Sequence, residues 1–315
     1  MSRVDVAPGP EQAPDGGGSP DGASGAGSTG GTGVVSPGQD PPLFDDVPPP
    51  AATEPRRCAK VDFLYVIDNS PTMVDKQENL ARSFIGFSRI VSQTLGTNDH
   101  HIMVIDTDAN NAGDVLYGVD SAQCASKLGA GRRVGSEGED CSIEGNQRFV
   151  LDQQENLEST FSCLAKVGIY GNAEELPIQA MLNATGGMDN ETDECNAGFL
   201  RDDAVLVVTI ITDEDDEDSS GQPSTWKVNL LRAKGGNEES VVVLGLIADN
   251  HIPGGLLGGP CDEFSGSPSP RLEQFVRSFD LNAIGSVCAP DYSGFFAAAV
   301  SNIDTACDDF VPVVR

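Results

Sequence analysis

The sequence predicts an α/β domain built on a doubly wound, mostly parallel sheet flanked by helices. Two continuous apolar runs, residues 61–67 and 204–212, are rich in β-branched side chains, as is typical of central strands buried on both faces. Amphipathic stretches of helical length alternate with these and other short apolar runs at the spacing of βαβ units. Roughly 260 residues in one such Rossmann-like domain would bury about three quarters of the extended-chain surface, so stability requires no second core.

The elements follow in order from changes in periodicity. The first strand, 61–67, ends at Asp68 and precedes an amphipathic helix over 75–95. A strand over 100–106 comes next, followed by a loop-rich insertion over 110–147 that a disulfide would staple. The later elements are helices over 151–167 and 174–184, an acidic loop over 189–196, a strand over 204–212, a helix over 226–233, a strand over 240–247, a Gly-rich loop around Cys261, a helix over 270–279, a strand over 283–288 and a helix over 292–308.

Residues 1–54 differ in composition from the rest of the chain. They consist mainly of Gly, Pro, Ser, Ala and Asp and contain almost no large apolar side chain, so they cannot bury enough surface to offset the entropy of ordering. We expect a disordered linker, followed by one folded domain over 55–315. The linker is either a tether about 40 Å in reach or a plain tail.

Composition limits the function and the cellular location. The net charge of −30 and a pI near 4.1 argue against nucleic acid and against anionic lipid surfaces as partners. No apolar run approaches the ~18 residues of a membrane helix. Eight cysteines without a Cys-x-x-Cys pair suit disulfides in an oxidising compartment, yet no signal peptide is visible. We hypothesise that the gene start is annotated downstream of the true one, so that an export signal or lipid anchor was lost, and we expect an extracellular or cell-surface protein.

The loop after the first strand carries three oxygen-bearing side chains. It reads Asp68-Asn69-Ser70-Pro71-Thr72, at the carboxyl end of a strand, where open α/β sheets place ligand sites. A carboxylate with two hydroxyls suits Mg²⁺, Mn²⁺ or Ca²⁺ rather than zinc. The alternative is a strand-to-helix turn in which Thr72 caps the helix and Asp75 favours its positive end, and both interpretations can hold together.

This loop resembles the metal-ion-dependent adhesion site of von Willebrand factor type A domains, whose signature is Asp-x-Ser-x-Ser after the first strand. Here a threonine, Thr72, stands in the last place. The resemblance implies that Ser70 and Thr72 bind the cation directly and that Asp68 acts through a bound water. It also implies a further ligand at the end of the fourth strand, where Thr212-Asp213 stands in place of the family's Thr-Asp-Gly turn.

The sequence departs from the family pattern at the remaining ligand. The family has a threonine before the third helix, whereas this chain has Glu174-Glu175 there. Glu175, or Glu174, would add negative charge and favour Ca²⁺, or these glutamates simply favour a helix N-terminus. The acidic run 213–218 is either a solvated loop or, through a residue such as Asp215, a second cation site.

The resemblance implies a binding function rather than an enzyme. In the family the cation keeps an open coordination position that an acidic residue of a partner protein fills, and a bound cation would invert the local sign of this acidic surface. The competing hypotheses are a metal-dependent hydrolase, for which Asp106 at a strand end is a candidate, and a structural envelope domain whose degenerate site binds nothing. No hydrolase or dinucleotide motif is present. His100 and His101 begin a strand and point to opposite faces, which disfavours joint ligation, whereas His251 at a strand end either binds a metal or an anion or is simply exposed.

The cysteines allow 105 connectivities, and order along the chain guides our expectation. Cys124–Cys141, Cys163–Cys195 and Cys261–Cys288 are neighbours in sequence. Because members of the family keep their ends close together, the resemblance also suggests a Cys58–Cys307 bridge.

Overall fold

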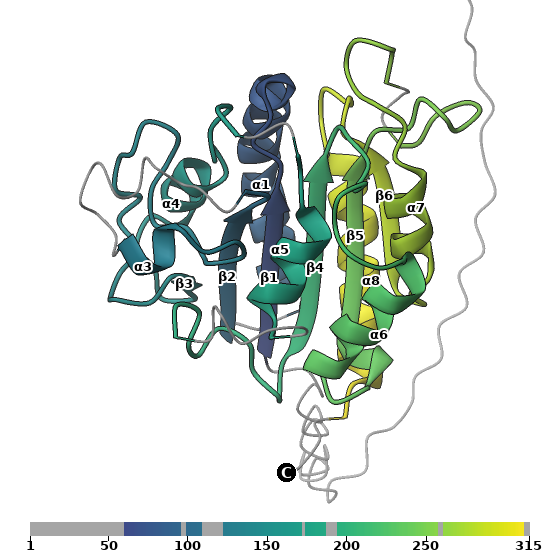
Figure 1. Cartoon of the computed structure of the whole chain (residues 1–315). Helices are drawn as coiled ribbons and strands as arrows, with labels where there is room; N and C mark the ends of the chain where they lie inside the picture. Colours follow the sequence, from purple (N-terminus) through teal and green to yellow (C-terminus); the bar gives the residue numbers. More distant parts are fainter. Residues whose placement is uncertain are drawn as a thin grey trace, which may run out of the picture. The chain divides into compact units, whose positions relative to one another are not determined.

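Six strands form one sheet in the order β3-β2-β1-β4-β5-β6 (Figure 1). Neighbouring strands are parallel except β3, which runs antiparallel to β2. The predicted α/β class with a mostly parallel sheet is therefore confirmed. This computed structural model describes residues 60–95, 99–108, 122–171, 174–186, 194–257 and 261–311. The expected linker over 1–54 lies outside the described residues.

The bounds of the elements are as follows. The strands are β1 (Lys60–Ile67), β2 (Asp99–Asp106), β3 (Val150–Leu151), β4 (Val205–Thr212), β5 (Val241–Ile247) and β6 (Asn282–Ser286). The α-helices are α1 (Val74–Leu95), α3 (Ala122–Ala125), α4 (Leu157–Leu164), α5 (Pro177–Ala184), α6 (Pro223–Ala233), α7 (Pro270–Arg277) and α8 (Ser293–Asp309). The 3₁₀ helices within the described residues are η1 (Pro71–Met73) and η3 (Glu238–Ser240).

The central strands β1 and β4 bury side chains on both faces. In β1, Phe63, Tyr65 and Ile67 join one core while Leu64 and Val66 join the other. This period of two is the alternation of a strand, and every residue of β4 is buried in the same way. The apolar runs that predicted central strands therefore do form the middle of the sheet.

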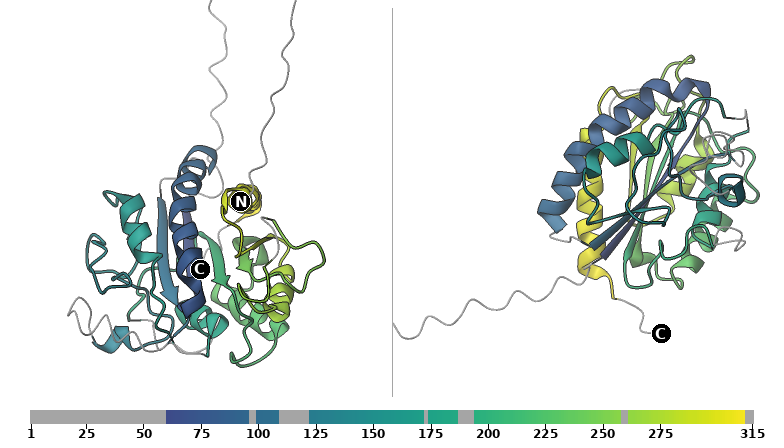
Figure 2. Two further views of the ribbon diagram at one scale, coloured as in Figure 1. Left: turned by 90° about the horizontal axis from the view of Figure 1, so that it is seen from above. Right: turned by 90° about the vertical axis from the view of Figure 1, so that its left-hand side faces the viewer.

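Helices cover both faces of the sheet. Helices α1, α4 and α8 pack on one face, and α5, α6 and α7 pack on the other (Figure 2). Helix α1 turns Leu80, Phe84, Phe87 and Val91 toward the sheet at the three- and four-residue spacing of a helical face. Helix α1 begins at Val74, immediately after the segment between β1 and α1 that carries Ser70 and Thr72.

Proline marks the start of three helices. Pro177, Pro223 and Pro270 are the first residues of α5, α6 and α7. At this position the missing N–H costs no intrahelical hydrogen bond and the fixed φ of proline suits the helix. These helices therefore begin at Pro177 rather than at residue 174, and at Pro223 rather than at residue 226.

The predicted helix over 151–167 is shorter than expected. Val150 and Leu151 pair with β2 as a short edge strand, and α4 begins only at Leu157, after Asn156 with a left-handed φ of 56°. Backbone pairing with β2 takes precedence over the helical periodicity of this stretch.

The disulfides differ from the order-based prediction. The described bridges are Cys124–Cys195, Cys141–Cys163 and Cys261–Cys288. The pairings Cys124–Cys141 and Cys163–Cys195 were wrong, while Cys261–Cys288 is confirmed. The side chain of Asn196 binds the backbone of Gly129 and Gly131, which brings the segment that carries Cys195 against the segment that carries Cys124. The expected Cys58–Cys307 bridge lies outside the described residues, because Cys58 is not among them.

Candidate functional site

The candidate site lies where the sheet changes winding direction. Strands β2 and β3 lie on one side of β1, whereas β5 and β6 lie beyond β4. The loops after β1 and β4 leave the same edge of the sheet because these two strands are adjacent and parallel. In open α/β sheets this switch point, at the carboxyl ends of the strands, is where ligands bind. Asp68 follows β1 and Asp213 follows β4, so the two predicted strand-end acids come together there.

Asp68 is fully buried and held by hydrogen bonds on both carboxylate oxygens. The backbone N–H of Ser70 donates to Oδ1 at 2.6 Å, and the hydroxyl of Thr212 donates to Oδ2 at 2.7 Å. Burial, with a smaller contribution from the Asp213 charge, raises the pKa of Asp68 to about 6. Asp68 therefore links the ends of β1 and β4 through these hydrogen bonds. It also holds in place the loop that carries the hydroxyls of Ser70 and Thr72, which we call the hydroxyl loop.

The two hydroxyls of the loop face each other. Ser70 Oγ lies 3.1 Å from Thr72 Oγ1, and Thr72 lies at the exposed surface. The carboxylate of Asp213 is buried, and neither of its oxygens accepts a hydrogen bond from the described residues. A buried carboxylate without a donor is rare in folded proteins and calls for a positive charge.

Lys76, which the sequence analysis did not single out, supplies a positive charge at this site. Its ammonium lies 3.2 Å from Oδ2 of Asp213 and donates a 2.7 Å hydrogen bond to the carbonyl oxygen of Thr72. The lysine and aspartate side chains are only 4% and 1% exposed. One signal was present in the sequence, since Lys76 stands in the first turn of a helix, where the helix macrodipole disfavours a cation.

Glu175 lies beside the same site. Its side chain is buried, Oε2 accepts a hydrogen bond from the Thr107 hydroxyl, and Oε1 has no hydrogen-bond partner in the part of the chain that the structure describes. Burial, followed by the nearby charge of Asp68, raises the pKa of Glu175 to about 9. Glu175 is thus a third carboxyl group at this site, beside Asp68 and Asp213. With a pKa of about 9, Glu175 is protonated at neutral pH in the metal-free protein.

Two loops flank the site and carry exposed aromatic side chains. Gly171 donates its N–H to the Asn69 carbonyl, and a Cβ at this glycine would displace the side chains of Asn69 and Asp108. On the Asp213 side, a Cβ on Gly266 would lie 2.9 Å from the Asp213 carbonyl oxygen. Next to these glycines stand Tyr170, 93% exposed, and Phe264, 84% exposed.

The remaining candidates have other contacts. Asp106 forms a buried ion pair with Arg132, and Glu174 is exposed to solvent. Both carboxylate oxygens of Asp215 accept hydrogen bonds from backbone N–H groups at the start of α7. Asp216 in turn accepts from the N–H of Ile178 in α5. Two residues of the acidic run, Asp215 and Asp216, thus cap helices. Acidic residues commonly cap helices, but the sequence alone does not show which of the six do so.

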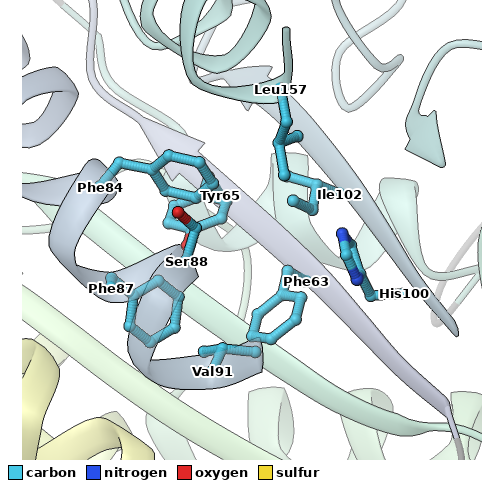
Figure 3. A pocket seen from close by; sticks show the side chains of 9 residues that line it. All are labelled: Phe63, Tyr65, Phe84, Phe87, Ser88, Val91, His100, Ile102 and Leu157. Carbon is cyan, nitrogen blue, oxygen red and sulfur yellow. The ribbon is translucent and has the colours of Figure 1, made fainter. Parts of the chain in front are cut away.

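His100 and His101 belong to β2 and lie away from the loops of the site, whereas His251 lies in the loop after β5, at the same carboxyl edge as Asp213. His101 contacts the Phe199 carbonyl, and His251 contacts Glu273. His100 lines a hollow under α1 with Phe63, Tyr65 and Phe87, shown in Figure 3. The cavity is about 20 Å³, enough for about one water molecule, whereas small-molecule sites typically have 300–1,000 Å³. We therefore treat it as imperfect packing rather than a functional site.

The side-chain oxygens at this carboxyl edge are of the type that hard cations prefer. They are the hydroxyls of Ser70 and Thr72, the carboxylate of Asp213 and the unpartnered oxygen of Glu175, all oxygen ligands of the kind that Mg²⁺ and Ca²⁺ prefer. Within the described residues, no group of three or more His, Cys, Asp or Glu side chains could hold a metal. A cation here would depend on the hydroxyls as well as on the carboxylates.

Comparisons with known proteins leave the family open. No family model matches the chain, and no curated protein matches it. Among solved structures, two crystal forms of proximal thread matrix protein 1 from the mussel byssus align with TM-scores of 0.43 and 0.39, at 10% and 11% identity. The alignments cover 79% and 78% of this chain but only 49% and 47% of the mussel protein, about half of its length. We draw no argument from a similarity this weak. Among the described helices, none is long and apolar enough to cross a membrane.

Proposed function

We propose that this chain is a cation-dependent protein-recognition module, similar to von Willebrand factor type A domains, that acts outside the cell or at its surface. In this proposal Ser70, Thr72 and Asp213 hold a divalent cation, Mg²⁺, Mn²⁺ or Ca²⁺, and Asp68 positions the loop. The observation that carries the proposal is the buried carboxylate of Asp213 at the switch point of the sheet, which accepts no hydrogen bond from the described residues and has the Lys76 ammonium as its ion-pair partner.

The placement of the motif residues supports the resemblance. Asp68 and Asp213 follow the two adjacent central strands, and the Thr212 hydroxyl joins the two loops through Asp68. Glu175, at the place of the family's threonine, is buried beside Asp68 and brings the additional carboxyl group that favours Ca²⁺.

A protein partner that offers an acidic side chain fits this surface. The chain carries a net charge of −30, so a bare acidic group would be repelled, whereas a bound cation inverts the sign locally. Tyr170 also lines a cleft of about 300 Å³ with Val74, Glu78 and Lys166, next to the hydroxyl loop. Exposed aromatic side chains and a ligand-sized cleft beside the site are the usual anchors of a protein interface.

The disulfides support the location. The three described bridges require an oxidising compartment, which extracellular and cell-surface proteins meet. Extracellular fluid also supplies the millimolar divalent cations that a weak site needs.

Thermal unfolding tests the cation site. The oxidised full chain is heated with chelator or with Mg²⁺, Mn²⁺ or Ca²⁺, beside Asp68→Ala, Asp213→Ala and the control Asp203→Asn. Asp203 is an exposed acid before β4 that pairs with Lys60. A cation at 100 times its Kd adds about 2.7 kcal/mol, which raises Tm by about 5–10 °C in a domain of this size.

The expected result is a cation-dependent rise in Tm that both site variants abolish and the control retains. A rise of equal size in Asp213→Ala would place the cation elsewhere. No rise with any cation would remove the proposed function and favour the structural envelope domain.

A second experiment tests the open coordination position. Mn²⁺ bound with an exchangeable water enhances solvent proton relaxation, and a carboxylate that takes the water's place reduces this enhancement. We expect a short peptide with a central glutamate to reduce it, and the same peptide with glutamine to leave it unchanged. Equal effects of the two peptides would contradict acidic-partner recognition.

A further inference from the structure

The buried ammonium of Lys76 lies within the proposed cation site. It is 3.2 Å from Asp213 Oδ2 and 2.7 Å from the Thr72 carbonyl oxygen. Among the described residues it is the one basic group within ion-pair distance of Asp213. Lys76 therefore neutralises the carboxylate on which the cation would depend.

We propose that Lys76 is a tethered cation that competes with the divalent cation for Asp213, so that metal binding displaces its ammonium. This proposal rests on the proposed function, because it names the residue that sets the affinity of that site. Metal-free and metal-loaded protein then differ in the position of one lysine side chain.

The geometry explains why the two cations exclude each other. Lys76 stands four residues after Thr72, and its ammonium binds the carbonyl of the residue whose hydroxyl would ligate the metal. A divalent ion on Asp213 and Thr72 would lie within a few ångströms of the ammonium, where like charges repel strongly even at the dielectric of a protein surface. A lysine can leave such a position because its ammonium sits on a flexible four-carbon stem.

Two surface acids near Lys76 could pair with its ammonium after displacement. The carboxylate of Asp75, which is 76% exposed, lies 3.5 Å from the ammonium in the present position. Asp262 lies near enough for the Lys76 charge to lower its pKa, although local hydrogen bonds from Ser265 and Phe264 have the larger effect. Surface acids on both sides of the site can therefore receive the displaced ammonium.

The consequence is an affinity lower than the donor set alone would give. Each binding event must replace an internal ion pair, so the site fills only where divalent cations are abundant. In this way the same chain stays neutralised and folded at low cation concentration and becomes competent for recognition at high concentration.

The test measures Mn²⁺ affinity by titration calorimetry for the wild-type full chain, Lys76→Met, Lys76→Arg and Lys227→Met. Lys227 is a matched control, because it also binds one carboxylate, Glu238, and one backbone carbonyl, that of Ser278. We expect Lys76→Met to bind Mn²⁺ at least tenfold more tightly, Lys76→Arg to stay near wild type because it keeps the charge, and Lys227→Met to change less than twofold. Equal or weaker binding by folded Lys76→Met would overturn the proposal.

A second measurement needs no variant. Lysine reactivity toward an acylating reagent is read by mass spectrometry on the wild-type chain with chelator and with Mn²⁺. Lys76 should be protected with chelator and react several-fold faster with Mn²⁺, while Lys227 should not change. Unchanged protection of Lys76 at saturating Mn²⁺ would overturn the proposal even if Lys76→Met fails to fold.

The outcomes separate this proposal from the proposed function. If wild type binds no cation but Lys76→Met does, the competition stands and the recognition function of the native chain fails. If wild type and Lys76→Met bind equally well, the competition fails and the cation site stands. If no variant binds a cation, both fail.

Discussion

Replacing Asp213 by Asn in the metal-free protein removes the buried carboxylate beside the Lys76 ammonium and leaves the exposed carboxylate of Asp75 at 3.5 Å. The Lys76 and Asp213 side chains are 4% and 1% exposed, so water cannot take the carboxylate's place. Removing one partner of a buried pair typically costs about 3–5 kcal/mol. Lys76 keeps its hydrogen bond to the Thr72 carbonyl and its contact with the exposed Asp75 carboxylate, so we expect the lower end, about 3 kcal/mol. Lys76→Met leaves the Asp213 carboxylate buried without a partner and should cost a similar amount.

The double variant Lys76→Met/Asp213→Asn should cost less than the sum of the two single variants. It leaves no unpaired charge, so the cycle should give a coupling energy of about 1–3 kcal/mol. Urea unfolding followed by circular dichroism, with chelator present and disulfides intact, measures all four proteins, and equal m-values show that the same transition is compared. Additive losses would show that Lys76 and Asp213 do not stabilise each other and would refute the ion pair as the reason why the Asp213 carboxylate is tolerated in a buried position.

Three further predictions address single residues. Asp215→Ala should lower stability by about 1–2 kcal/mol, because two N–H groups of α7 lose their acceptor, and should leave Mn²⁺ affinity unchanged; a loss of affinity would return Asp215 to the cation site. Gly266→Ala should cost about 1–3 kcal/mol in urea unfolding and weaken Mn²⁺ binding, because the added Cβ meets the Asp213 carbonyl; wild-type values for both would show that the loop yields freely. Burial lowers the pKa of His100 below its ordinary 6.5, so its contribution to stability should be complete above about pH 6.5 and decrease as the pH falls toward the lowered pKa. His100→Gln should remove that part of the slope, and a wild-type slope in the variant would contradict this. The charges around the His100 imidazole are those of Asp152, His101, Arg201 and Asp99.

Sequence was sufficient for the centre of the fold. The β1 and β4 runs were located to within one residue because a strand buried on both faces leaves a continuous apolar signal. The two-residue strand β3 left no such signal, since it exists only through its pairing with β2. Cysteine connectivity depends in the same way on which loops the fold brings together, and two of the order-based pairings were wrong for that reason.

The candidate site was predictable in part. Asp68 and Asp213 follow from strand ends, because parallel neighbours deliver their loops to one edge. The burial of Glu175 beside Asp68 and the position of the Lys76 ammonium depend on side-chain packing between segments far apart in sequence. The helix-capping roles of Asp215 and Asp216 also depend on contacts between distant segments. An acidic run has the same sequence whether its carboxylates bind water, a cation or helix N–H groups.

Titration of Mn²⁺ into the oxidised full chain and into Asp213→Ala tests the central claim most directly. The account predicts one saturable site per chain in the wild type and no saturable site in Asp213→Ala. Saturable binding that survives Asp213→Ala, or no binding by the wild type at millimolar Mn²⁺, would contradict it.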